Sequence, residues 1–143
     1  VLMHMKGAPK TMQAAPGYRD VVQEVTNFLV RRMAQCAQAG IPRQRIALDP
    51  GIGFGKTVAH NAVLMRRLDT LGQLGCPLLV GLSRKSMIAQ ISAAEPADQR
   101  LPGSLAGALY AMIKGASILR VHDVAATRQA IAVWQALDGE GRD

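Results

Sequence analysis

Pro77-Leu78-Leu79-Val80-Gly81-Leu82 is an unbroken apolar run that leads directly into the polar sequence Ser83-Arg84-Lys85-Ser86. Such a run is typical of a strand in a parallel sheet, because helices cover both faces of that kind of sheet. The run therefore predicts a buried parallel strand, and the polar residues after it mark the strand's carboxyl end.

Three other short apolar segments each lead into a glycine-rich or polar turn. They are Val1–Met5, Arg45–Asp49 and Ser117–Val121. The stretches between the four segments carry apolar residues at helical spacing. These stretches predict helices over Tyr18–Ala39, His60–Leu74, Pro102–Gly115 and Val124–Leu137. A shorter helix is expected to have Ser83 as its N-cap and to end near Ile91.

Four successive β/α units predict an α/β fold with a parallel sheet, either open or closed into a barrel. Both architectures bind their ligands at the carboxyl ends of the strands. The unusual polar clusters of this sequence all fall at those ends. This coincidence indicates an enzyme.

The composition narrows the class of protein. The chain has 143 residues, 49% of them hydrophobic, which suits one compact domain. Its net charge is +7, but the basic residues are dispersed and only five residues are aromatic, so a small anionic substrate is favoured over nucleic acid. No apolar run approaches the roughly 20 residues that cross a bilayer, so no membrane association is expected.

The cysteines and the first residues give further expectations. Cys36 and Cys76 are 40 residues apart, without metal-ligand spacing, and are interpreted as buried free thiols. With no secretory signal in sight, they favour a cytoplasmic location. The chain starts without Met inside an apolar run, which suggests a fragment cut through a strand.

The first polar cluster is Asp49-Pro50-Gly51-Ile52-Gly53-Phe54-Gly55-Lys56. Its spacing fits neither a P-loop nor a dinucleotide fingerprint. Three alternating glycines let backbone approach a ligand closely, and Phe54 can offer a ring to a planar ligand. Asp49 either points into a ligand cleft or only caps a backbone N–H in a structural turn.

The second cluster is Ser83-Arg84-Lys85-Ser86, at the start of the predicted short helix. A helix N-terminus favours anions, so two cations there are unfavourable unless something anionic binds. The cluster therefore predicts an anion site, with a solvated surface as the alternative.

The third cluster is Arg120-Val121-His122-Asp123. Side chains two apart on a strand point the same way, so Arg120 and His122 form a candidate diphosphate clamp. The alternative is that Arg120 pairs with Asp123 and that His122 lies on the surface.

The remaining polar residues favour structural roles. His4 lies among apolar neighbours and is interpreted as a core residue. His60 and Asn61 are expected to cap the helix that begins there.

The order and spacing of these segments resemble dihydropteroate synthases over essentially the whole chain. The segments that carry the resemblance are Leu2–Gly7 with Pro9–Gln13, Asp49–Lys56 with His60-Asn61, Gly81–Ser86, Arg100–Ala106 and Arg120–Val124. The resemblance implies a (β/α)₈ TIM barrel of which this chain supplies about the C-terminal half, strands five to eight. Residues 1–143 are then one partial pterin-binding domain, and the first four strands are absent.

The resemblance also implies roles for the catalytic residues. Asp49 would accept hydrogen bonds from the guanidine-like edge of the pterin, and Lys85 would bind the pterin carbonyl and a ring nitrogen. Arg120 and His122 would hold the diphosphate, at the usual barrel phosphate site.

Substrate-binding roles follow in the same way. Met3 and Gly81 would line the pterin ring pocket, while Phe54 and Ser86 would contact p-aminobenzoate. The implied reaction joins a dihydropterin methyl diphosphate to p-aminobenzoate in folate biosynthesis, the step that sulfonamides target. It implies Mg²⁺ as cofactor, with the family's metal ligand in the missing half, and a homodimer.

The missing half leaves a second function open. Half a barrel has two unpaired sheet edges. The chain is expected to be a fragment of a longer enzyme, or a remnant that only binds pterin, phosphate or a partner chain. A third possibility, a methyltransferase barrel that uses a pterin, is disfavoured because methyl transfer has no diphosphate to clamp.

Overall fold

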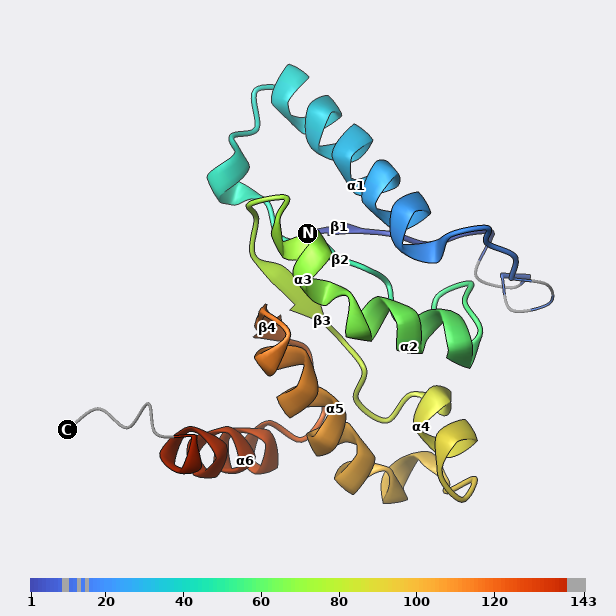
Figure 1. Ribbon diagram of the computed structural model, residues 1–143, viewed down its shortest axis with the longest axis vertical. Helices are drawn as coiled ribbons and strands as arrows, with labels where there is room; N and C mark the ends of the chain where they lie inside the picture. The colour runs from blue at the N-terminus through green and yellow to red at the C-terminus, as the bar shows by residue number, and fades with distance from the viewer. Residues whose placement is uncertain (9–10, 13, 15, 139–143) are drawn as a thin grey trace.

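The computed structural model describes residues 1–8, 11–12, 14 and 16–138. Four strands form one parallel sheet in the order β1-β2-β3-β4 (Figure 1). They are β1 (Leu2–Met3), β2 (Leu48–Asp49), β3 (Leu78–Val80) and β4 (Ala116–Leu119). The predicted parallel sheet is confirmed. The strands are shorter than the apolar segments, because the segment ends turn into loops.

In the described part of the chain, six α-helices connect or follow the strands. Figure 1 shows how they are arranged around the sheet. They are α1 (Val21–Gln38), α2 (Val58–Arg66), α3 (Leu68–Gly72), α4 (Ser86–Ile91), α5 (Leu101–Ile113) and α6 (Val124–Leu137). Two short 3₁₀ helices cover Arg43–Arg45 and Ala97–Gln99. The first helix begins at Val21 because the Asp20 carboxylate accepts hydrogen bonds from the N–H groups of Val22 and Gln23.

Two element predictions are wrong in more than their end residues. The helix predicted over His60–Leu74 is divided into α2 and α3, because Arg67 (φ −111°) departs from helical geometry. The strand predicted over Arg45–Asp49 begins only at Leu48, because the Arg45 N–H donates to the Pro42 carbonyl and closes a 3₁₀ turn.

Ser83 does not cap α4 as predicted. Arg84 follows it with a left-handed φ of +57°, which is incompatible with a helical first turn, and Lys85 is the residue that precedes the helix. The Ser83 hydroxyl instead lies within hydrogen-bond distance of His122.

The core lies between one face of the sheet and helices α1 to α5. Strand residues Leu48, Leu78 and Val80 are at most 2% exposed and belong to this core. Alternation along the strands turns their neighbours to the opposite face. Those neighbours are Met3, Asp49, Leu79, Gly81, Ile118 and Arg120. This opposite face therefore carries four of the predicted site residues.

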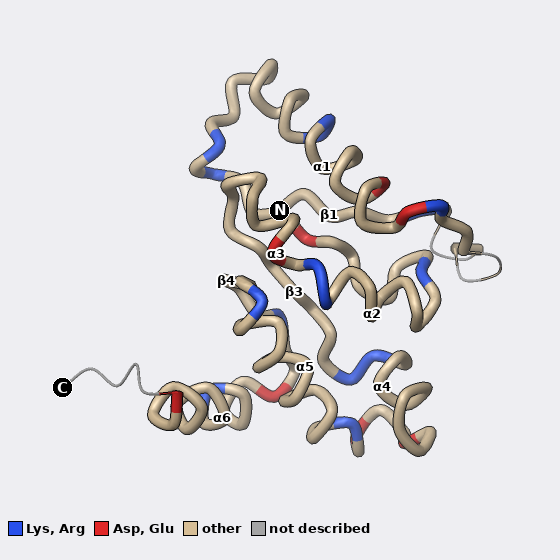
Figure 2. The backbone as a smooth tube through the Cα atoms, viewed as in Figure 1, with Lys and Arg blue, Asp and Glu red and all other residues tan. Residues whose placement is uncertain are grey.

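The outer strands have one partner each in the described part of the chain: β1 pairs with β2, and β4 pairs with β3. Figure 1 shows α1 and α6 at opposite ends of the molecule. Figure 2 shows Lys and Arg spread over many elements rather than gathered in one stripe. Among the described residues, no helix has the length and apolar character needed to span a membrane.

Candidate functional site

Asp49 ends β2 and is 5% exposed. Its Oδ1 accepts a hydrogen bond from the Gly51 N–H at 2.7 Å, so Asp49 caps this turn. Burial raises the pKa of its carboxyl above the usual value, and the Gly51 bond and the charges of Lys85, Arg120 and Lys56 oppose that rise. A buried carboxylate surrounded by cations can also accept hydrogen bonds from a cationic or amidine-like ligand.

The glycine-rich loop after β2 bends around the end of β1. Gly51, Gly53 and Gly55 all have left-handed φ angles, of +69°, +80° and +63°. A Cβ on Gly51 would lie 1.8 Å from the His4 carbonyl oxygen, so no side chain fits there. The Asn61 side chain, predicted to cap a helix, instead accepts a hydrogen bond from the Gly53 N–H at 2.9 Å and holds this loop.

His60 takes part in the start of α2, as predicted, although Thr57 is the N-cap. The Thr57 hydroxyl accepts from the His60 N–H at 3.1 Å, and the His60 ring accepts from the Thr57 N–H at 3.3 Å. This reciprocal pair is a capping box.

Lys85 reaches from the loop after β3 toward the glycine-rich loop. Its ammonium donates to the Ile52 carbonyl and lies 4.4 Å from the centre of the Phe54 ring. Burial lowers the pKa of Lys85 to about 8, with Arg120 acting in the same direction and Asp49 against it. The site thus places the flat Phe54 ring beside the Lys85 ammonium, which can lose its proton slightly above neutral pH.

Arg120 and His122 line one cavity of about 450 Å³, together with Val121, which lies between them in the chain. Gly81, Ser83, Arg84 and Lys85 line it too. A Cβ on Gly81 would lie 2.9 Å from the Arg120 Nε, so the guanidinium packs directly on the Gly81 backbone.

The His122 ring is held by Ser83. Its Nδ1 lies 3.0 Å from the Ser83 Oγ, and its backbone N–H donates to the same oxygen at 3.2 Å. Two cationic or donor side chains on a shared wall can bind a multiply charged oxyanion.

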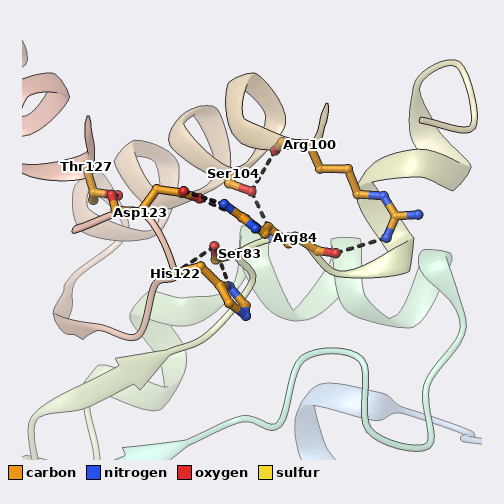
Figure 3. A network of polar contacts seen from close by, with 7 residues as sticks. All are labelled: Ser83, Arg84, Arg100, Ser104, His122, Asp123 and Thr127. Carbon is orange, nitrogen blue, oxygen red and sulfur yellow. Dashed lines mark hydrogen bonds and ion pairs between the residues drawn. The ribbon is translucent and has the colours of Figure 1, made fainter. Parts of the chain in front are cut away.

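Arg84 does not act with Lys85 as a pair of unpaired cations. Its Nε donates to one Asp123 carboxylate oxygen at 3.0 Å and its Nη2 to the other at 2.5 Å (Figure 3). These hydrogen bonds hold the pKa of Asp123 below its usual value. The alternative in which Arg120 pairs with Asp123 is therefore wrong, because Arg84 occupies that carboxylate.

Met3 and Ser86, two further predicted substrate-binding residues, lie on different elements. Met3 is the register partner of Asp49 on the neighbouring strand. Ser86 begins α4 and lines a different cavity, of about 420 Å³, together with Gly53 and Lys56. Pro9, Lys10 and Gln13, which belong to one of the quoted motifs, lie outside the described residues.

His4 is a core residue, as predicted, and is 5% exposed. Its ring packs edge-on against Phe28, with ring centres 5.0 Å apart. Burial and the charge of Lys56 lower the pKa of His4 to about 4.

Lys56 was missed by the sequence analysis. It is 4% exposed and donates to the carbonyls of Gly51 at 2.9 Å and Phe54 at 3.1 Å, and lies 3.0 Å from the His4 Nδ1. Its position directly after the last glycine of the loop suggested a role for Lys56. Its partner His4, however, lies 52 residues away along the chain, so the sequence did not indicate the contact.

A third cavity, of about 610 Å³, lies between α2, α4 and α5. It is lined mainly by apolar side chains, including Leu82, Met87 and Ile88, and by none of the predicted site residues. The converging charged groups make the cavity at Arg120 and His122 the better candidate site.

The sequence profile of the family described as pterin binding enzyme matches residues 1–122. This chain belongs to that family. Dihydropteroate synthase from Haemophilus influenzae is 54% identical over 135 residues, which are 94% of this chain and 49% of the relative. The Escherichia coli K12 dihydropteroate synthase is 51% identical over 94% of this chain and 48% of its own length. The chain spans about half the length of these curated relatives, their C-terminal half.

Solved structures of the same family superpose closely. Yersinia pestis dihydropteroate synthase, solved as a sulfonamide drug complex, gives a TM-score of 0.93 at 44% identity over 98% of this chain and 51% of that one. The Xanthomonas albilineans enzyme, in complex with 7,8-dihydropteroate, gives 0.88 at 47% identity over 96% of this chain and 51% of that one. The chain is thus a partial (β/α)₈ barrel of about four β/α units, as predicted.

Within the described ranges, no group of three or more His, Cys, Asp or Glu residues is arranged to hold a metal ion. Cys36 and Cys76 are free thiols, as predicted, and Cys76 is buried; the predicted burial of Cys36 is wrong, because that residue is partly exposed on α1.

Proposed function

We propose that this chain is the C-terminal half-barrel of a dihydropteroate synthase, a transferase that joins a dihydropterin methyl diphosphate to p-aminobenzoate. One observation carries the proposal: Asp49, Lys85, Arg120 and His122 converge at the carboxyl ends of β2, β3 and β4. The named relatives, at 51% and 54% identity, support it.

The pterin ring would lie over the face of the sheet that carries Met3, Asp49, Gly81 and Arg120. The Asp49 carboxylate, bonded to Gly51 by one oxygen, accepts two N–H donors from the guanidine-like edge of the ring. Lys85 exchanges its bond to the Ile52 carbonyl for the pterin carbonyl and a ring nitrogen. Met3 and Gly81 line the ring. The Thermus thermophilus enzyme, solved with 6HMPPP, supports a pterin diphosphate as the ligand.

The second substrate would lie beside Phe54 and Ser86. The Phe54 ring, already next to the Lys85 ammonium, offers a flat apolar surface to the aromatic ring of p-aminobenzoate. Ser86, at the start of α4, is placed to contact its carboxylate. The T. thermophilus enzyme has also been solved with 4-aminobenzoate.

The reaction begins when the bond between the pterin's methylene carbon and the diphosphate oxygen breaks, and the leaving group keeps the electron pair. Arg120 and His122 stabilise the negative charge that develops on the diphosphate. Asp49 stabilises the positive charge on the pterin. The amine nitrogen of p-aminobenzoate then bonds to the methylene carbon and loses a proton, which gives 7,8-dihydropteroate.

Mg²⁺ is the cofactor that the family resemblance implies. The described residues do not fit a protein-held metal site, since they contain no cluster of three ligands. A Mg²⁺ ion bound with the diphosphate would take its ligands from phosphate oxygens and from groups outside these residues. No step above is assigned to it.

The assembly and location are part of the proposal. The free thiols support the cytoplasm. A homodimer is proposed on the family resemblance, with each active site completed by the first four strands of a barrel.

A second candidate function is that of a remnant that binds pterin, phosphate or a partner chain without catalysis. Within the described residues, β1 and β4 pair with one strand each, and Ile118 is 40% exposed on the face that carries Asp49 and Arg120; both observations favour it. On so exposed a face, the substrates would have few protein contacts on the side that points away from the sheet.

Dihydropteroate formation separates the two functions. This chain would be incubated with pterin methyl diphosphate, labelled p-aminobenzoate and Mg²⁺, alone and with a separately expressed polypeptide that carries the first four strands of a relative. Product in either case supports the transferase. No product in both, from a mixture that forms a stable complex, contradicts it and leaves the binding remnant.

A further inference from the structure

Arg84 uses its backbone and its side chain to join three segments (Figure 3). Its N–H donates to the Ser104 Oγ at 2.9 Å, and its carbonyl accepts from the Arg100 Nη1 at 2.9 Å. Ser104 in turn donates to the Arg100 carbonyl at 2.7 Å. The guanidinium holds both oxygens of Asp123. The loop after β3 is thereby tied to the start of α5 and to the loop after β4.

These ties stabilise an unfavourable backbone conformation. Arg84 has φ of +57°, in the left-handed region that non-glycine residues seldom adopt. Its N–H and C=O both have partners on the α5 side, so the surrounding structure maintains this conformation. The turn at Arg84 sets the direction in which the next residue, Lys85, leaves β3.

Asp123, the acidic partner in the ion pair, lies next to the candidate site residue His122 in the chain. Asp123 directly follows His122, and its carbonyl accepts from the Thr127 N–H at 3.0 Å and the Thr127 Oγ1 at 2.9 Å. Ser83, the neighbour of Arg84, accepts the His122 N–H. Two parallel links therefore join the loop that carries Lys85 to the loop that carries Arg120 and His122.

We propose that Arg84 is a positioning residue, whose ion pair with Asp123 sets the spacing between Lys85 and the Arg120–His122 pair. The inference rests on the proposed function for the identity of the ligand, a diphosphate. Arg84 lines the cavity, but the Asp123 carboxylate neutralises its charge, so it adds little attraction for an anion.

Asp123→Asn distinguishes positioning from direct anion binding. If Arg84 were an anion ligand, removal of the nearby carboxylate would free the guanidinium and tighten the binding of inorganic diphosphate. A positioning role gives the opposite sign: Asp123→Asn and Arg84→Ala each weaken diphosphate binding about tenfold, and the double variant is no weaker than either. Arg84→Lys, which keeps one donor, falls between. Unchanged or tighter binding by Asp123→Asn overturns the proposal.

Hydrogen exchange gives a readout that needs no ligand. The His122 amide, which donates to Ser83, should exchange about tenfold faster in Arg84→Ala and Asp123→Asn, because the loop opens more often. Arg128→Ala, an exposed cation on α6, is the matched control and should leave that amide unchanged. Unaltered exchange at His122 in both Arg84→Ala and Asp123→Asn overturns the proposal. A wild-type chain that binds no diphosphate would count against the proposed function alone, and the exchange test would still apply.

Discussion

The ammonium nitrogen of Lys56 lies 3.0 Å from the Nδ1 of His4, and both side chains are at most 5% exposed. The same ammonium donates to the Gly51 and Phe54 carbonyls, so it ties the glycine-rich loop to the segment after β1. His4 can accept from an ammonium only as the neutral imidazole. The loop that carries Phe54 and flanks Asp49 therefore depends on an uncharged His4.

Acid should destabilise the protein through His4. Its pKa falls from the usual 6.5 to about 4 in the folded chain, so between those values the unfolded chain binds the proton and the folded chain does not. The His4 contribution is complete above pH 6.5 and is lost as pH falls toward 4. We expect about 2 kcal/mol less stability at pH 5 than at pH 7, measured by urea unfolding.

His4→Gln is the control for this loss, because glutamine can accept from Lys56 and does not titrate. Its unfolding free energy should change less between pH 7 and pH 5 than that of the wild type. An equal change in both proteins would show that other groups cause the acid sensitivity.

Alkali should weaken ligand binding through Lys85. Its pKa of about 8 means that the ammonium is mostly neutral by pH 9. The affinity for pterin methyl diphosphate should therefore fall about tenfold between pH 7 and pH 9, measured by calorimetry. Lys56, whose pKa burial also lowers to about 8, titrates in the same range. Lys85→Arg separates the two, because arginine keeps its charge; the same fall in that variant would assign the effect elsewhere.

Asp49→Asn should weaken pterin binding without lowering the stability of the fold. Burial disfavours the ionised carboxylate, so the asparagine variant should be at least as stable as the wild type, and its carbonyl can still accept from Gly51. It should bind a phosphate-free pterin about a hundredfold more weakly, because a charged double acceptor is lost. Inorganic diphosphate binding should not weaken. Wild-type pterin affinity in this variant would remove Asp49 from the proposed site.

The sequence was informative where a residue's neighbours along the chain decide its structure. The apolar run around Leu78–Val80 predicted a buried parallel strand, and the spacing of Arg120 and His122 selected two residues that line one cavity. Contacts between segments were harder to predict. The ion pair of Arg84 with Asp123 joins residues 39 positions apart, and nothing local distinguishes it from a pair between Arg120 and Asp123.

Strand register explains why the sequence predicted local structure better than contacts between segments. Gly81 lies next to Arg120, and the Ser83 hydroxyl meets His122, only because β3 and β4 pair with Val80 opposite Leu119. The register also shifts between Leu78 and Leu79, an irregularity that the apolar pattern does not encode. The sequence could therefore name the site residues but not their hydrogen-bond partners.

Arg120→Ala should affect phosphate and pterin binding to different extents. The guanidinium packs on Gly81 and lines a cavity with His122, and Asp49 is not among the residues that line that cavity. Its loss should weaken inorganic diphosphate binding about a hundredfold, and phosphate-free pterin binding by less than about threefold. Gly81→Ala should reproduce part of the effect, because its methyl group would displace the guanidinium without removing it. Arg128→Ala, of equal charge change, should alter neither affinity. Equal losses for the two ligands in Arg120→Ala would refute the clamp, because a residue that binds only the diphosphate cannot weaken a ligand that lacks one.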